Sequence, residues 1–159
     1  MAPLALSCFR ADMAYNSPMP DSPFIFDVTE GGFADDVLTR SHDVPVVVDF
    51  WAPWCVPCRT LGPMLERLVA EGDGAWVLAK VNVDEAGRLS AEYGVRGIPA
   101  VKAFRAGQVV AEFTGAQPEP RVREFLRKLA PSPADVALEH GLSLLATRKW
   151  DQAAEAFRR

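Results

Sequence analysis

Cysteine and histidine are scarce in this chain, which has three cysteines and two histidines among 159 residues. So few cysteines argue against a secreted scaffold held together by several disulfides. The sequence also has no basic run and no apolar stretch of transmembrane length, so we expect neither nucleic acid binding nor a membrane span. With 49% hydrophobic residues and a formal net charge of -4, the chain is long enough to bury a core of its own.

The N-terminal residues 1–23 are expected to form a flexible tail rather than an export signal. The apolar part, residues 2–9, is short and has no positive charge before it, and Arg10 and Asp12 follow without a small-residue cleavage site. Three prolines between residues 18 and 23 then disfavour regular structure. We therefore expect a cytoplasmic protein.

The most informative segment is a Cys-x-x-Cys pair, Cys55 and Cys58, which lies between an apolar run and a helical pattern. The run Val44 to Trp51 is typical of a strand buried on both faces, and we expect a helix to begin at Cys55. Unpaired N–H groups and the helix dipole would favour the thiolate of Cys55, which is the nucleophilic form. Cys58 is close enough to close a short disulfide with it, and we expect Cys58 to be the less exposed sulfur.

A structural zinc site is the alternative use of these two cysteines. It would need two further ligands, and the chain offers only Cys8 and the isolated His42 and His140. Because no second cysteine pair exists, the pattern favours redox chemistry, and we expect no metal and no other cofactor.

Two charged residues interrupt apolar strand patterns. Asp49 lies within the run before the cysteines, where burial would raise its pKa and let it act as general acid or base for Cys58. The alternative places Asp49 at a frayed strand end without a chemical role. Lys80 lies in the run Trp76 to Val83, either near Asp49 as its partner or exposed on a strand face.

The remaining pattern alternates strands and helices. We expect strands over residues 24–28, 75–83, 99–105 and 108–114, the last two joined by a turn at Ala106 and Gly107. We expect one helix capped by Thr29 that runs to about Thr39, and one capped by Asp84 that ends near Gly94. Two more helices have apolar stripes, formed by Leu61, Met64, Leu65, Leu68 and Val69, and by Val122, Phe125, Leu126 and Leu129. This order predicts an α/β fold, a mixed central sheet with helices on both faces.

Four segments in this order resemble thioredoxin. They are residues 49–58, 80–84, 93–99 and Gly115, and the resemblance covers about residues 24–130. It implies a thioredoxin domain in which Cys55 attacks, Cys58 resolves, Asp49 carries protons with Lys80 nearby, and a cis proline faces the disulfide. Clients would bind as extended strands, and the residues implied in contacting them are Trp54, Val56, Pro57, Ile98, Pro99 and Gly115. Val56 stands where the family usually has glycine, so its branched side chain bears on the redox poise.

Beyond residue 130 the composition changes. Pro131, Ser132 and Pro133 indicate a linker, and residues 134–159 indicate two helices. Gly141, Leu144, Ala153 and Phe157 fit the small and large positions of a tetratricopeptide repeat, although an ordinary helical hairpin is the alternative. Because such repeats are stable only when stacked, we expect either a longer protein or a hairpin that packs on a partner or on the thioredoxin domain.

A thioredoxin domain followed by such repeats resembles the bacterial co-chaperedoxins, the YbbN-like proteins. The resemblance implies two functions. One is a protein disulfide oxidoreductase, recharged by a thioredoxin reductase with electrons from NADPH. The other is a chaperone-linked holdase that binds unfolding clients and passes them to the chaperonin and the Hsp70 system.

Overall fold

A computed structural model of the protein describes residues 22–129 together with Leu142, Ala146 and Thr147. Nearly all of the predicted N-terminal tail and of the predicted C-terminal hairpin therefore lies outside the described residues. Cys8 and His140 are among the residues left out. Within the described part no helix has both the length and the apolar character that crossing a membrane requires.

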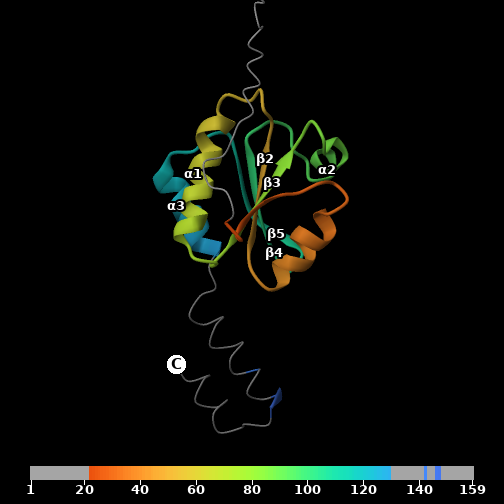
Figure 1. Cartoon of the computed structure of the whole chain (residues 1–159), viewed down its shortest axis with the longest axis vertical. Coiled ribbons are helices and arrows are strands. Elements are labelled where there is room, and N and C mark those ends of the chain that lie inside the picture. The colour runs from red at the N-terminus through yellow and green to blue at the C-terminus, as the bar shows by residue number, and fades with distance from the viewer. Residues whose placement is uncertain (1–21, 130–141, 143–145, 148–159) are drawn as a thin grey trace, which may run out of the picture.

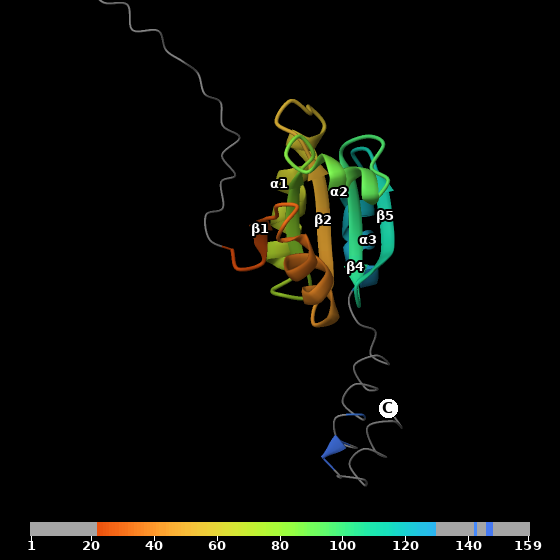
Figure 2. The same ribbon diagram turned by 90° about the vertical axis from the view of Figure 1, so that its right-hand side faces the viewer.

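The described domain is built around one five-stranded mixed sheet. Its strands are β1 (Ile25–Asp27), β2 (Val46–Trp51), β3 (Val77–Asn82), β4 (Ala100–Arg105) and β5 (Gln108–Thr114). They lie in the order β1-β3-β2-β4-β5. Figure 2 shows β2 between β1 on one side and β4 and β5 on the other. β1, β3 and β2 are parallel, whereas β4 and β5 are each antiparallel to their neighbours. The predicted mixed sheet is confirmed.

Helices cover both faces of the sheet (Figure 1). One face carries α1 (Cys58–Glu71) and α3 (Glu119–Leu129), and the other carries α2 (Gly87–Glu92) and two short segments, η1 (Ala34–Thr39) and η2 (Arg40–His42). Alternate residues of β2 serve the two cores, since Val47 packs with α1 and α3 while Val48 packs with Val37 of η1.

Both predicted apolar stripes pack in the core. Leu61, Leu65 and Val69 of α1 are buried against the sheet together with Leu126 of α3. Phe125 is only partly buried and meets Phe113 of β5 edge to face, with ring centroids 5.0 Å apart. The contact clamps α3 onto β5.

The predicted turn between the last two strands is also confirmed. β4 and β5 are joined by Ala106 and Gly107, whose φ angles are 51° and 75°. Two consecutive left-handed residues make the turn that suits the twist of paired strands. Ser41 of η2 fixes this turn, because its hydroxyl accepts the N–H of Gly107 at 2.8 Å.

Two predicted helix starts are wrong. Thr29 does not cap a helix; its hydroxyl accepts the N–H of Gly32 at 3.3 Å within a turn, and regular structure begins only at Ala34 because Gly31 and Gly32 disfavour helix. Asp84 does not cap α2 either. The cap comes from Glu30, whose carboxylate accepts the N–H groups of Arg88 and Leu89 at 2.8 and 3.3 Å.

Candidate active site

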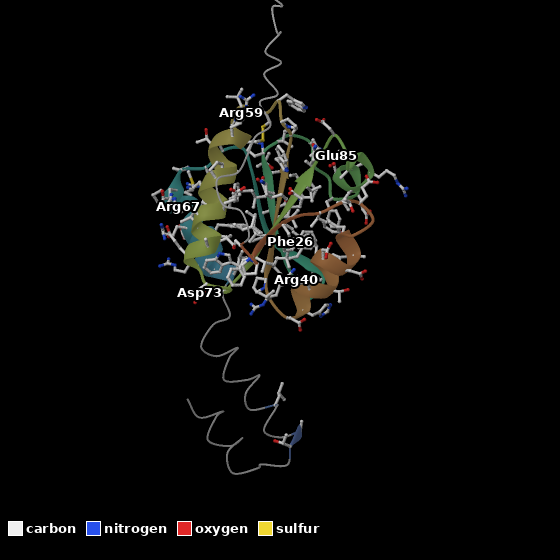
Figure 3. All side chains as sticks on the ribbon, in the orientation of Figure 1. Phe26, Arg40, Arg59, Arg67, Asp73 and Glu85 are labelled. Atoms are coloured by element: carbon white, nitrogen blue, oxygen red, sulfur yellow. A yellow bond between two sulfur atoms is a disulfide. The ribbon has the colours of Figure 1, made fainter. Side chains whose placement is uncertain are left out.

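The two cysteines form a disulfide where β2 gives way to α1. Cys55 and Cys58 are bonded through their sulfurs, with Cα atoms 5.3 Å apart. In Figure 3 the yellow sulfur bond lies at the end of the sheet near Arg59. The sequence-predicted pair is therefore joined in the folded protein, beyond the carboxyl end of the central strand.

The helix after the disulfide begins at Cys58, not at Cys55 as predicted from the sequence. A residue that precedes proline avoids the helical conformation, so Val56 cannot join the helix and Pro57 becomes the N-cap residue. Cys55 thus lies just outside the helix terminus. Its sulfur still accepts the N–H of Cys58 at 3.3 Å, so a thiolate there would be stabilised by a helix N-terminus.

Burial does not distinguish the two cysteines in the disulfide form. Each residue is 4% exposed when the disulfide is closed. In contrast to the buried cysteines, two residues next to Cys55 are exposed: Trp54 is 63% and Val56 69% exposed. The Val56 side chain thus adds apolar surface beside the disulfide. Closing the disulfide holds both sulfurs in one apolar cluster with Ala52.

A hydrogen bond that was not predicted from the sequence holds Trp54 in place. The indole N–H of Trp54 donates to the carboxylate of Asp84 at 2.9 Å. Asp84 follows β3, as Trp54 follows β2, and the two strands are parallel neighbours whose carboxyl ends meet. The contact between Trp54 and Asp84 could have been predicted from this parallel pairing of the two strands.

The loop before β4 brings a second predicted group to the disulfide. The peptide bond between Ile98 and Pro99 is cis, as the resemblance implies. Ile98 packs against the cluster that contains both cysteines. Gly115 lies alongside, because its N–H donates to the carbonyl of Pro99 at 2.7 Å.

Asp49 is buried beneath the disulfide. It lies within β2 and is 1% exposed, which contradicts the alternative of a frayed strand end. Its Oδ1 atom has no hydrogen-bond partner in the described structure. Burial raises the pKa of Asp49 to about 7, and the positive charge of Lys80 opposes that rise.

A small cavity connects Asp49 to the disulfide. Asp49 and Cys58 line it together with Arg59, Lys80 and other residues, and its volume of about 10 Å³ is close to the space of one water molecule. A proton could therefore pass between the carboxyl of Asp49 and the sulfur of Cys58 within the cavity.

Lys80 is buried rather than exposed. It is the β3 residue paired in register with Asp49, and it is 7% exposed. Its ammonium group forms an ion pair with Glu66 of α1, with Nζ and Oε1 2.8 Å apart. Glu66 was missed, although it lies one turn after Gly62 on the side of α1 that faces the sheet.

The zinc alternative finds no support in the described residues. Nowhere among them do three or more histidines, cysteines or acidic residues cluster as a metal would require. His42 lies beside the turn at Gly107, where β4 ends, whereas the disulfide is at the other end of the sheet. Cys8 and His140 are outside the described residues.

A disulfide at a helix N-terminus, a buried carboxyl group with a raised pKa and an adjacent cis proline define a thiol–disulfide exchange site. The sequence pattern of the thioredoxin family matches residues 24–128. The chain belongs to the thioredoxin family, and it is a thiol–disulfide oxidoreductase whose redox pair is Cys55 and Cys58.

Curated relatives agree with this assignment. Thioredoxin 1 of Nostoc sp. is 41% identical over 101 residues, which cover 64% of this chain and 92% of the relative. The mitochondrial thioredoxin of Mus musculus is 44% identical over 104 residues, 65% of this chain and 62% of the relative. Thioredoxin of Porphyra purpurea is 36% identical over 104 residues, 65% of this chain and 95% of the relative.

Proposed function

We propose that the protein reduces disulfides in client proteins by two successive exchanges. In the first, the Cys55 thiolate attacks one client sulfur; a Cys55–client bond forms, and the second client sulfur leaves as a thiolate that takes up a proton. In the second, Cys58 attacks the sulfur of Cys55 and releases the first client sulfur. The Cys55–Cys58 disulfide beside a buried carboxyl group is the observation that carries the proposal.

Asp49 has the proton-transfer role in this scheme. Cys58 must lose its proton before it can attack, and the carboxylate of Asp49 lines the same cavity. With a pKa of about 7, Asp49 is poised to accept that proton near neutral pH and to return it later.

The surface around the disulfide would hold the client. Exposed Trp54, Val56 and Pro57 provide an apolar rim on one side, and Ile98 and Pro99 border the other. An extended client segment would align with the backbone beside Pro99, with Gly115 as a second border. Val56 is a larger apolar contact than glycine could supply.

Regeneration requires an electron donor. We propose a thioredoxin reductase that draws electrons from NADPH, acting with this protein in the cytoplasm. The test is a coupled assay: NADPH oxidation should depend on this protein and on insulin as the disulfide client. Failure of every thioredoxin reductase tried, with full activity from dithiothreitol, would reject this donor and leave the exchange chemistry in place.

A second function, client holding, is favoured by the sequence after the domain. The family match ends at residue 128, and the tetratricopeptide-like pattern begins near residue 134. A helical hairpin with apolar Leu144, Leu145 and Phe157 would bind exposed apolar surface on an unfolding client, or dock on the chaperonin or the Hsp70 system. In this reading the protein is a co-chaperedoxin.

Deleting residues 131–159 separates the two functions. The shortened protein should retain nearly all disulfide reductase activity, because the family match spans residues 24–128 and contains the disulfide and the cis proline. It should lose the ability to suppress aggregation of an unfolding client, measured by light scattering. A full-length chain with Leu144→Ser and Phe157→Ser controls for the change in length. It should also retain reductase activity and lose aggregation suppression.

Two results would count against this assignment. Loss of reductase activity in the deletion would make the C-terminal segment an integral part of the thioredoxin domain. Undiminished aggregation suppression in the deletion would move client holding to the thioredoxin domain itself.

A further inference from the structure

A buried ion pair lies beside the proton-transfer residue and has no part yet in the chemistry. Lys80 Nζ and Glu66 Oε1 are 2.8 Å apart, and their side chains are only 9% and 3% exposed. Burying two charges costs free energy even when they are paired, and apolar residues of similar size would often serve stability as well. Stability alone therefore does not account for this pair.

The pair is placed to act on Asp49. Lys80 is the register partner of Asp49 in the neighbouring strand, and both line the cavity that reaches Cys58. Glu66 approaches from α1, on the same side of the sheet. The charged or titratable groups that face Asp49 are thus Lys80 from β3, and Cys58, Arg59 and Glu66 from α1.

We infer that Glu66 is a positioning residue for thiol–disulfide exchange: by holding the ammonium group of Lys80, it sets the pH range in which Asp49 takes the proton from Cys58. The inference rests on the proposed role of Asp49 in proton transfer. Glu66 does not touch the reacting sulfurs, so it acts only through Lys80 and through its own charge.

The two charges act on Asp49 in opposite directions. Lys80 lowers the pKa of Asp49 and Glu66 raises it, and the effect of Lys80 is the larger. Removing the charge of Glu66 takes away its repulsion and also releases the ammonium group toward Asp49. Both changes make Asp49 ionise at lower pH. Removing both charges leaves desolvation unopposed, so Asp49 then ionises at higher pH than in the wild type.

The test compares Glu66→Gln with a matched control, Glu71→Gln. Glu71 is on the same helix but exposed, where it pairs with Arg67 and Arg123. Two quantities are measured on the full chain: the ¹³C chemical shift of the Asp49 carboxyl group against pH in the disulfide form, and the pH profile of mixed-disulfide resolution in a single turnover.

In Glu66→Gln both midpoints should fall by about one pH unit. Glu71→Gln should match the wild type, and Glu66→Asp should restore most of the wild-type profile. Glu66→Gln combined with Lys80→Met should raise the Asp49 midpoint above the wild-type value. If Glu66→Gln alone does not fold, this double variant still tests the net effect of the pair, in which the charge of Lys80 outweighs that of Glu66.

An unchanged or raised Asp49 midpoint in folded Glu66→Gln would overturn the inference, as would a lowered midpoint in the double variant. Asp49→Asn separates this result from the proposed function. If Asp49→Asn alters the resolution profile while Glu66→Gln does not, proton transfer by Asp49 stands and the role of Glu66 is wrong. If Asp49→Asn leaves the profile unchanged, the proton-transfer step is itself wrong.

Discussion

Replacing Cys55 by serine should abolish disulfide reduction, lowering the rate of insulin reduction by about 1,000-fold or more. A serine hydroxyl at neutral pH carries almost no negative charge, whereas the Cys55 sulfur lies at the N-terminus of α1 and accepts the N–H of Cys58. The measurement is the turbidity of reduced insulin with dithiothreitol as electron donor.

Two further variants make this result specific. Cys8→Ser should retain full activity, since Cys8 belongs to neither the pair nor the family match. In the reduced wild type, iodoacetamide should modify Cys55 well below the pH at which a free thiol reacts, and Cys58 much more slowly. Full insulin reduction by Cys55→Ser, or equal alkylation of both thiols, would contradict the assigned roles.

Replacing Asp49 by asparagine should stabilise the oxidised protein at alkaline pH. The pKa of Asp49 is raised from 3.8 to about 7, so the folded state binds this proton more tightly than the unfolded state does. Folding stability therefore falls as the pH rises from about 4 to about 7, by up to about 4 kcal/mol. The neutral amide of the variant carries no such penalty, so denaturant unfolding should show a stability gain that grows from about pH 4 to about pH 8.

The same substitution should slow catalysis. Without a carboxylate to accept the proton of Cys58, resolution of a mixed disulfide near pH 7 should fall by about 10- to 100-fold, and less at pH 9, where the thiol ionises unaided. Asp73→Asn is the control, because Asp73 is exposed and its φ of 44° is one that asparagine tolerates. A resolution rate equal to that of the wild type from pH 6 to pH 9 would assign Asp49 a purely structural role.

Local pattern predicted most of the fold. The apolar run before Cys55 became the central strand, and the spacing of Leu61, Leu65 and Val69 gave the buried face of α1. Ala106 and Gly107 were recognisable as a two-residue turn. Each of these features depends on residues close together in the sequence, where strand and helix periods are visible.

The side-chain contacts that were missed join residues far apart in the sequence. Glu30 caps α2 from 58 residues away, and Trp54 meets Asp84 across 30 residues. Glu66 and Lys80 lie 14 residues apart, on a helix and on the strand beneath it. A sequence shows that these residues carry charge, but only the packing of β2, β3 and α1 shows which charges meet.

The candidate site was predicted better than its local geometry. Cys55 and Cys58 were identified because a cysteine pair at this spacing is conspicuous, and Asp49 was proposed beside them because a carboxylate within an apolar run is unusual. The start of α1 was placed three residues too early, since the effect of Pro57 on Val56 outweighed the helical pattern.

The order of attack by the two cysteines is tested most directly by trapping the intermediate in Cys58→Ser. With the resolving sulfur removed, the client should remain attached to the protein through a mixed disulfide. Mass spectrometry of non-reduced peptides should place the client cysteine on Cys55 in equimolar amount. Attachment to Cys8, or no stable adduct while insulin reduction continues, would contradict attack by Cys55 and resolution by Cys58.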